Sequence, residues 1–257
     1  MEFKKLQKIL SEEIAKNRQK NADLLYKKNT KLQLSDAFFC GEDVVKNRKF
    51  YEAIQKALKD LKNIFPEERI HVLDAGSGTG ILGILALISW ADHVVFIEAN
   101  QQTLAWSKAF IEKIWCWEKS TFYLEDASKI LLQKKYHLLI SETITIDFQT
   151  EDFQKIIKHL KKYLFQQAII IPESFKLSFT QTDSYKNILS QNAITRKSLW
   201  DFQEHTEHIG KDTESLELSW EARLYDGVSL KSWEAISFFN AKTFKKEKIG
   251  DEFIWGK

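Results

Sequence analysis

Apolar positions along the chain follow two periods, and each period predicts a different kind of element. A three- to four-residue spacing predicts a helix over residues 2–26, with an apolar face made of Phe3, Leu6, Leu10 and Ile14. Residues 27–41 have no such spacing and are predicted as a loop. The helical spacing returns from residue 43 and ends before Pro66, which bars continuation of the helix.

From residue 70 to residue 171, short apolar runs alternate with helical patterns. The runs predict five strands, at residues 70–73, 93–97, 121–124, 136–140 and 168–171. The patterns between them predict helices at residues 81–90, 101–117 and 151–164. Strands that are apolar throughout and separated by helices indicate a mostly parallel sheet covered on both faces. Because such crossovers are right-handed, we expect a doubly wound α/β fold with its site at the carboxyl ends of the strands.

The pattern changes after Pro172. Alternating or β-branched and aromatic residues predict antiparallel strands at residues 175–180, 216–220 and 235–239, whereas residues 184–215 are polar and irregular. The chain is therefore divided into a helical arm over residues 1–42, an α/β domain over residues 43–171 and a smaller antiparallel region over residues 172–257. The arm could cover a cofactor site, bind a partner or stay solvated.

Composition narrows the classes of function. Charged residues make up 29% of the 257 residues and nearly cancel to a net charge of +2, so there is no electrostatic case for a nucleic-acid partner. Cys40 and Cys116 have neither metal-ligand spacing nor a disulfide framework, which predicts no metal site and a reduced, cytoplasmic setting. The longest apolar run, residues 81–91, is too short to span a bilayer, and the first residues lack the apolar core of a signal peptide. We therefore expect no membrane partner.

Three of the nine glycines lie within five positions, at Gly76, Gly78 and Gly80, between a predicted strand and a predicted helix. A strand, a glycine turn and a helix N-terminus form a cradle for a nucleotide cofactor, because the N–H groups of the first helical turn point at the ligand. The segment from Gly78 to Gly83 also satisfies the dinucleotide pattern G-x-G-x-x-G. However, Asp74 ends the strand before the first glycine, and a carboxylate there would repel a pyrophosphate.

Acidic residues after three successive strands favour S-adenosylmethionine as the cofactor. Asp74 suits the cationic amino group of this zwitterionic methyl donor, and Glu98 is placed to accept from both ribose hydroxyls. Glu125 and Asp126 could accept from the adenine amino group. Each acid alone could be a solvated strand end, but their occurrence after three strands makes a methyl-donor site the better interpretation.

A second pair of carboxylates follows the fourth strand. Glu142 lies at the end of that strand, and Glu151 opens the next predicted helix nine residues later. Taken singly, Glu142 is typical of an exposed loop and Glu151 of a charge that stabilises a helix dipole. Because both of these ends face the cofactor in a doubly wound fold, the pair is the candidate for catalysis.

These motifs resemble the protein arginine methyltransferases. Residues 72–82 are similar to that family's cofactor loop, and residues 141–151 match its two-glutamate loop, including the nine-residue separation. Residues 169–177 resemble the exit from the cofactor domain, and residues 231–239 resemble the strands around a Thr-His-Trp loop. The resemblance runs from Asp43 to the last residue. It implies a Rossmann-like class I methyltransferase followed by a reduced, antiparallel β-barrel-like region.

Two carboxylates suit the chemistry of a guanidinium group. A guanidinium is charged and delocalised at neutral pH, so its nitrogens are poor nucleophiles. Paired, charge-assisted hydrogen bonds could polarise it and aim one nitrogen in line at the donor's methyl carbon. Two glutamates without a cation would repel each other, so the pair itself suggests a cationic substrate.

Three departures separate the chain from the family pattern. Ser232 stands where the family has a histidine, in Lys231-Ser232-Trp233. In the helix before the glycine loop, Arg48 is shifted by one position from the family's arginine, and it is only a candidate ligand for the donor's carboxylate. The region after Pro172 is shorter than a full barrel, with one strand expected beyond Trp233, and a dimerisation arm is hard to find.

The sequence therefore predicts an S-adenosylmethionine-dependent N-methyltransferase. Its substrate would be arginine in a protein or peptide, or a free guanidino compound, held by Glu142 and Glu151 without a metal or a covalent intermediate. A homodimer is compatible with the resemblance. Two alternatives stay open: methyl transfer to a non-guanidino amine, hydroxyl or natural product, and a catalytically inactive member that serves as a binding partner.

Overall fold

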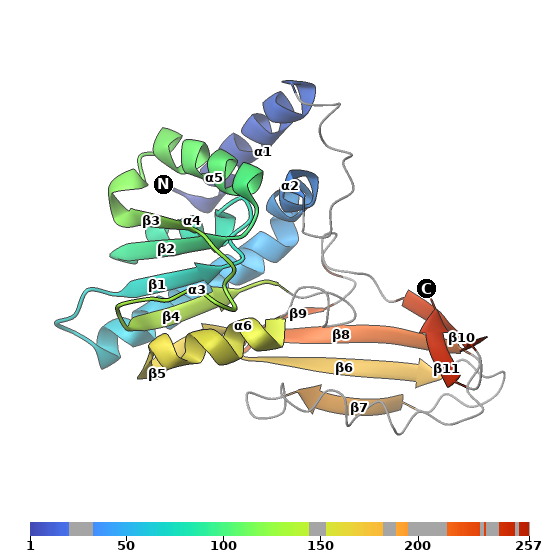
Figure 1. Cartoon of the computed structure of the whole chain (residues 1–257). Coiled ribbons are helices and arrows are strands. Elements are labelled where there is room, and N and C mark those ends of the chain that lie inside the picture. The colour runs from blue at the N-terminus through green and yellow to red at the C-terminus, as the bar shows by residue number, and fades with distance from the viewer. Residues whose placement is uncertain are drawn as a thin grey trace.

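The computed structural model contains a parallel sheet and an antiparallel sheet joined end to end (Figure 1). It describes residues 1–20, 33–143, 153–181, 189–194, 215–231, 234, 242–249 and 252–256. Within the second sheet, side chains are described for residues 174 and 221–231. The predicted strand at 235–239, together with Glu151, Ser232 and Trp233, lies outside the described residues.

The parallel sheet has the strand order β3-β2-β1-β4-β5, and every neighbouring pair is parallel. Its strands are β1 (His71–Ala75), β2 (His93–Glu98), β3 (Ser120–Leu124), β4 (Tyr136–Ser141) and β5 (Leu164–Ile171). The predicted doubly wound sheet is thus confirmed. The order reverses between β1 and β4, and this reversal opens a crevice at the carboxyl ends of the two strands, where α/β proteins bind ligands.

Six α-helices and two short 3-10 turns accompany this sheet in the described chain. The longer ones are α1 (Phe3–Lys20), α2 (Leu34–Glu42), α3 (Val44–Ile64), α4 (Ile81–Ile88), α5 (Gln101–Lys113) and α6 (Phe153–Leu160), and α6 runs into a short 3-10 turn, η2 (Lys161–Tyr163). A further 3-10 turn, η1 (Trp117–Lys119), precedes β3. Capping side chains fix two of the starts: Asp43 accepts from the Lys46 amide before α3, and Asn100 accepts from the first amides of α5.

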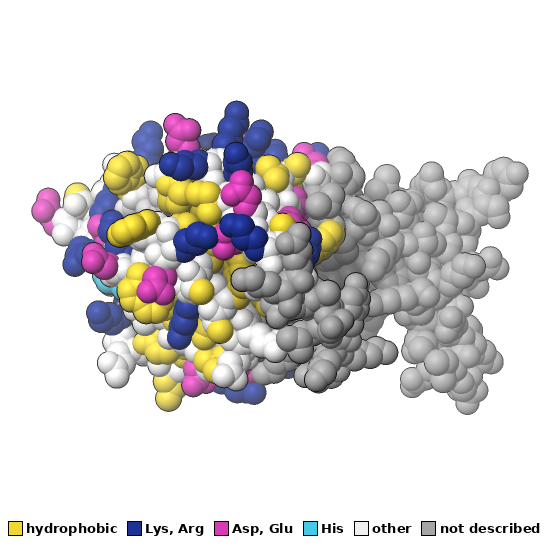
Figure 2. Space-filling view, turned by 90° about the horizontal axis from the view of Figure 1, so that it is seen from above, with side chains coloured by type: hydrophobic (Ala, Val, Ile, Leu, Met, Phe, Trp, Pro, Cys, Tyr) yellow, Lys and Arg dark blue, Asp and Glu magenta, His cyan; other side chains and the backbone are white. Residues whose placement is uncertain are grey.

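The N-terminal helix is packed rather than solvated. The predicted apolar face of α1 is buried, with Leu6, Leu10 and Ile14 fully covered. Figure 1 shows α1 and α5 together on one side of the parallel sheet. On that side, seen from above in Figure 2, basic, acidic and hydrophobic side chains are interspersed over the described residues.

Helix α2 corrects the prediction of a loop over residues 27–41. Its nine residues form only about two turns, too short for apolar spacing to be recognised. A reciprocal cap starts the helix, because the Gln33 amide donates to the Asp36 carboxylate at 2.9 Å. Phe38 then anchors it: the ring is fully buried and meets Trp106 edge-on at 5.0 Å.

The antiparallel sheet has the order β11-β10-β8-β6-β7, and β9 pairs with β8. Its strands are β6 (Ser174–Gln181), β7 (Leu189–Ile194), β8 (Ser215–Tyr225), β9 (Val228–Lys231), β10 (Lys242–Ile249) and β11 (Glu252–Gly256). Strands predicted at 175–180 and 216–220 are confirmed. Strand β7 lies in the segment that the sequence predicted as irregular. Its sequence is polar, and it is defined as a strand by backbone pairing with β6, which apolar spacing does not reveal. Two strands, β10 and β11, follow Trp233 where the sequence predicted one.

A tight hairpin joins the antiparallel sheet to α3. Asp226 and Gly227 have φ angles of 43° and 78°, the left-handed turn that an Asp-Gly pair favours between antiparallel strands. The Tyr225 hydroxyl donates to Asp60 of α3 at 2.9 Å, and Lys56 of α3 pairs with Asp226 at 3.0 Å. The hairpin also places Leu224 and Leu230, both fully buried, in the common core.

Among the residues that the structure describes, no helix has the length and apolar character needed to cross a bilayer.

Three histidines line the amino ends of neighbouring strands, opposite the crevice. The His71 ring lies 5.8 Å from the His93 ring and 6.2 Å from the His137 ring, centroid to centroid. Burial, the neighbouring imidazoles and the cations Lys134 and Arg69 lower the pKa of His71 below its ordinary value of 6.5. Burial and the same two cations lower the pKa of His93. The folded protein therefore favours neutral imidazoles at His71 and His93.

We expect the contribution of His71 and His93 to the free energy of unfolding to fall as the pH drops below about 6.5. The unfolded chain takes up protons on these imidazoles near that pH, whereas the folded protein does so only at lower pH, so the stabilisation present above this pH is lost. Urea unfolding of wild type and His71→Asn between pH 7.5 and pH 5 isolates this contribution, because wild type should lose stability relative to His71→Asn as the pH falls. His159→Asn, on α6 outside this cluster, is the matched control, and an unchanged slope in His71→Asn would contradict the assignment.

Candidate functional site

The predicted donor-binding residues follow the carboxyl ends of β1, β2 and β3, and the candidate catalytic Glu142 follows that of β4. Ala75, the last residue of β1, is aligned with Ile97 of β2 on one side and with Ser141 of β4 on the other. The glycine loop after β1 and Glu142 after β4 therefore start from adjacent points of the sheet. This is the switch point of the fold, as the sequence predicted.

The glycine loop has the backbone that its glycines permit. Gly76, Gly78 and Gly80 have φ angles of 71°, 53° and 77°, which side chains with a Cβ adopt only with strain. A Cβ at Gly76 would also collide with the Thr143 side chain. The amides of Gly76 and Ser77 both donate to the carbonyl of Ile97, at 2.9 and 3.0 Å, so the loop is tied to the end of β2.

Glu98 is held in place by two backbone amides. Its Oε2 accepts from the Gly78 amide at 2.9 Å and its Oε1 from the Asn100 amide at 2.8 Å. These two bonds, one to each oxygen, fix the direction of the carboxylate, and a carboxylate has about four acceptor sites in all. The half-buried Glu98 therefore has the orientation and the chemistry expected for a residue that binds ribose hydroxyls.

Asp74 faces the start of α4 rather than open solvent. It is 1% exposed, and its Oδ2 accepts from the Gly83 amide at 2.8 Å. Burial, opposed by that hydrogen bond and reinforced by Glu98 and Glu142, raises the pKa of Asp74 to about 8. A Cβ at Gly83 would collide with Phe96 and approach this carboxylate. The third glycine of the G-x-G-x-x-G pattern is thus explained by close packing of the helix on the strands.

Glu125 and Asp126 follow β3 but differ in environment. The Glu125 amide donates to the carbonyl of Glu98 at 3.1 Å, which brings the two strand ends together, and its side chain is exposed. Asp126 accepts from the amide and the hydroxyl of Ser128, at 2.9 and 2.7 Å, and pairs with Lys129. Burial would raise the pKa of Asp126, but these hydrogen bonds outweigh it and lower the pKa. Asp126 thus caps its own turn, whereas Glu125 faces solvent.

The candidate catalytic Glu142 is paired with a buried lysine. Lys46 Nζ lies 2.8 Å from Glu142 Oε2, and the two side chains are 1% and 14% exposed. Burial alone would lower the pKa of Lys46, but the neighbouring Cys40 and Glu142 raise it above its ordinary value. The lysine therefore stays charged and supplies a cation to Glu142 within the protein itself.

The sequence analysis singled out Arg48 on this helix and missed Lys46. Arg48 is exposed, whereas Lys46 lies on the buried face of α3, one helical turn before the buried Phe50. A lysine on the apolar face of an amphipathic helix is unusual unless it is paired. The four-residue spacing between Lys46 and Phe50 could therefore have identified Lys46 from the sequence. Glu151, the second predicted catalytic residue, lies outside the described residues.

The glycine loop also contains an unused polar group. The Ser77 hydroxyl is buried, with the residue 6% exposed, and it has no hydrogen-bond partner among the described residues. A buried polar group without a partner costs free energy, so a ligand that reached it would relieve that cost. The loop, Ser77 and the oriented Glu98 together fit a nucleoside with a polar amino-acid end.

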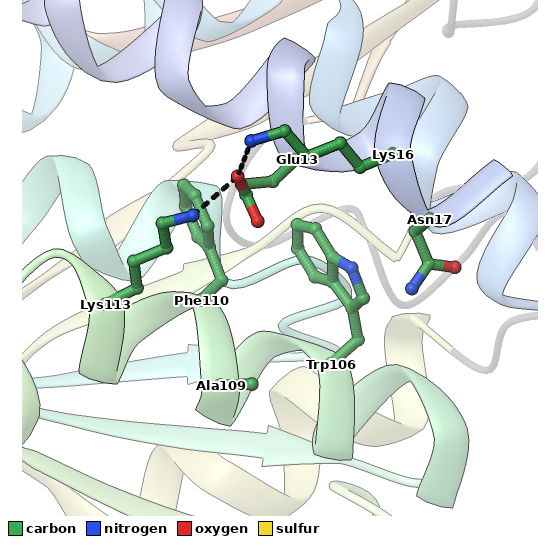
Figure 3. Close-up of a pocket in the computed structure, with 7 residues that line it drawn as sticks. All are labelled: Glu13, Lys16, Asn17, Trp106, Ala109, Phe110 and Lys113. Atoms are coloured by element: carbon green, nitrogen blue, oxygen red, sulfur yellow. Dashed lines mark hydrogen bonds and ion pairs between the residues drawn. The ribbon is translucent and has the colours of Figure 1, made fainter. Parts of the chain in front are cut away.

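A separate cavity of about 230 Å³ lies between α1 and α5 (Figure 3). One carboxylate oxygen of Glu13, on α1, pairs with the ammonium groups of Lys16 and Lys113, at 2.9 and 2.6 Å. Trp106 forms part of the cavity wall. None of the predicted site residues lines this cavity. It is a feature of the α1–α5 contact rather than of the crevice.

The sheet order and the glycine loop at the switch point define a class I methyltransferase fold, followed by a small antiparallel sheet. Residues 41–199, more than half of the chain, match the model of the family described as Conserved hypothetical protein 95, and the protein belongs to this family. One chain of the Trypanosoma brucei PRMT1 enzyme–prozyme heterotetramer, solved with AdoHcy, is similar in fold. Its TM-score is 0.57 at 12% sequence identity, over 82% of this chain and 87% of that chain.

Curated relatives confirm the resemblance stated from the sequence. Protein arginine N-methyltransferase 7 of Drosophila melanogaster is 27% identical over 135 residues, which are 51% of this chain and 19% of that protein. The protein of the same name in Drosophila willistoni is 46% identical over 57 residues, or 22% of this chain and 8% of that protein. The match thus spans a fifth or less of these relatives' length. The chain thus has the class I methyltransferase fold and resembles the arginine methyltransferases.

Replacement of Asp74 should stabilise the free protein at alkaline pH. The folded protein keeps this proton up to about pH 8, whereas the unfolded chain loses it near 3.8, so the stabilisation present below pH 3.8 is lost as the pH rises. We expect Asp74→Asn to raise the free energy of unfolding at pH 8 by at least about 1 kcal/mol, the equivalent of one pKa unit. Little change is expected at pH 4.

Urea unfolding at the two pH values would measure this difference. Asp126→Asn is the matched control and should change stability in the opposite direction, because hydrogen bonds lower the pKa of Asp126. An Asp74→Asn protein less stable than wild type at pH 8 would contradict the raised pKa.

Breaking the Lys46–Glu142 pair should destabilise the fold. Lys46→Met leaves a largely buried carboxylate without its cation, which typically costs about 3 kcal/mol. Lys46→Arg keeps the charge and should retain most of the stability. Arg48→Met, on the exposed side of the same helix, should change the free energy of unfolding by less than about 0.5 kcal/mol. Equal unfolding midpoints for Lys46→Met and Arg48→Met would argue against the pair.

Proposed function

We propose that the protein is an S-adenosylmethionine-dependent methyltransferase that acts on a guanidino group. The substrate would be arginine in a protein or peptide, or a free guanidino compound. The observation that carries the proposal is the position of Glu142, which follows β4 directly beside the end of β1 that leads into the glycine loop. A carboxylate there lies next to the donor cradle, where an acceptor must bind.

The donor half of the proposal is supported by the fold and by the residues of the loop. S-adenosylmethionine supplies an electrophilic methyl group on a sulfonium. Glu98 would bind the ribose, the loop amides and Ser77 would bind the amino-acid end, and the exposed Glu125 would reach the adenine amino group. Asp74 would act from behind the loop, because its carboxylate already accepts from the Gly83 amide. The similar Trypanosoma brucei complex contains AdoHcy, the product of this donor.

The acceptor half depends on how Glu142 shares its oxygens. Lys46 occupies Oε2, so Oε1 is the oxygen that would hold the substrate. Glu151 would supply the second carboxylate. One nitrogen would then be aimed at the methyl carbon. As the new N–C bond formed, the S–C bond of the donor would break to leave S-adenosylhomocysteine, and the proton of that nitrogen would leave to a carboxylate or to water.

The same ion pair favours a second candidate function. From the sequence alone, two glutamates without a cation implied a cationic substrate. Lys46 supplies a cation within the protein, so Glu142 does not require one from the substrate. Methyl transfer to an uncharged amine or hydroxyl of a small molecule is therefore the second candidate. Incubation with labelled donor and cell extract, followed by mass spectrometry of the labelled molecule, would distinguish the two.

We expect Glu142→Gln and Glu151→Gln each to reduce methylation of an arginine substrate by about a hundredfold or more, because an amide cannot form the charge-assisted pair. Transfer of labelled methyl to arginine-rich peptides and to free arginine measures the effect. Glu118→Gln, at an exposed residue of η1 away from the predicted site, is the control for general loss of activity. Near wild-type rates in both glutamine variants would overturn the assignment of the pair.

A further inference from the structure

The segment from Gly41 to Asn47, here called the α2–α3 junction, contacts three separate parts of the molecule. Gly41 lies against Thr79 of the glycine loop, since a Cβ there would come within 3.0 Å of the Thr79 hydroxyl. Lys46 reaches Glu142 at 2.8 Å. Asn47 faces α1. One short stretch thus contacts the donor cradle, the acceptor residue and the N-terminal helix.

A buried polar cluster fixes this junction to α1. The Gly41 carbonyl accepts from Gln7 Nε2 at 2.8 Å and from Asn47 Nδ2 at 2.7 Å. Asn47 Nδ2 also donates to Gln7 Oε1 at 3.2 Å. Gln7 is 6% exposed and Asn47 is fully buried. We call these three residues, one from each of α1, α2 and α3, the Gln7 cluster.

The cluster explains why a glutamine lies on the apolar face of α1. Carbonyls in the last turn of a helix lack intrahelical partners, and the Gly41 carbonyl is in the last turn of α2. Gln7 satisfies this buried carbonyl and at the same time accepts from Asn47. The apolar contacts of Leu6 and Leu10 hold α1 on the core without directional preference, whereas the hydrogen bonds of Gln7 require one position of the helix.

Other polar contacts of α1 are more exposed and hold it less strongly. Arg18 pairs with Glu42 at 2.9 Å, but the two side chains are 42% and 26% exposed. Exposed ion pairs of this kind contribute little. The Gln7 cluster is therefore the directional anchor between α1 and the junction.

We propose that Gln7 is a positioning residue of the methyl-transfer site. By fixing the junction, Gln7 determines how closely Gly41 packs on Thr79. It also determines the position of the α3 cap at Asp43, and thereby the direction of Lys46 toward Glu142. The N-terminal helix then helps to position the residues of the site and does more than cover the core. This inference rests on the proposed function, since it assigns Gln7 a role in that same site.

The test compares Gln7→Leu with Leu10→Val. Gln7→Leu keeps a helix-forming side chain of similar size but removes both hydrogen bonds, and Leu10→Val weakens the apolar contact of the same helix one turn away without touching the cluster. Calorimetry with S-adenosylhomocysteine should show affinity reduced about tenfold in Gln7→Leu, because a buried carbonyl loses a partner and the junction shifts. Leu10→Val should bind within about twofold of wild type.

Hydrogen exchange supplies a readout that does not depend on the ligand. In Gln7→Leu the amides of residues 41–47 and 76–80 should exchange faster than in Leu10→Val. If wild type binds the ligand and Gln7→Leu matches Leu10→Val in affinity and exchange, the role of Gln7 is overturned and the proposed function stands. If wild type does not bind the ligand, the proposed function fails, and faster exchange in both segments of Gln7→Leu still supports positioning by Gln7. Unchanged exchange would overturn it.

Discussion

The ion pair between Lys46 and Glu142 is the interaction on which the arrangement of the crevice depends. It joins the start of α3 to the end of β4 and gives the largely buried Glu142 a buried cation. Without that cation, the Glu142 carboxylate would lie in a poorly solvated space with little to offset the cost of its charge. The position of α3 is thus set by electrostatics at its first turn and by apolar packing along the rest of its length.

The parallel sheet was predictable because its strands are short, apolar throughout and separated by recognisable helices. The sequence analysis missed elements that are stabilised by caps, single contacts or backbone pairing rather than by a periodic apolar face. Helix α2 depends on a reciprocal cap and on Phe38 against Trp106, and β7 depends on backbone pairing with β6, neither of which leaves a period in the sequence. Which basic residue of α3 faces the site was harder still to predict. The sequence pointed to Arg48, whereas the buried face of the helix carries Lys46.

The candidate site was predictable to the level of which strand ends carry it. Glu98 lies where a ribose ligand is expected, and its two amide donors explain why it is oriented. Residue types alone do not show that Asp74 turns toward Gly83, or that Asp126 accepts from Ser128 in its own turn. Both depend on hydrogen bonds to backbone amides, whose positions follow from the folded chain and not from residue type.

The Asp226–Gly227 hairpin connects the antiparallel sheet to α3, and α3 in turn contacts the end of β4 in the parallel sheet. Asp60 receives the Tyr225 hydroxyl in the later part of this helix, and Lys46 lies near its start, about 20 Å away along the axis. A tilt of about 3° at the hairpin would move the Lys46 ammonium by about 1 Å, which is enough to lengthen its bond to Glu142. A shift of the antiparallel sheet that tilted α3 would therefore reach the carboxylate beside the glycine loop.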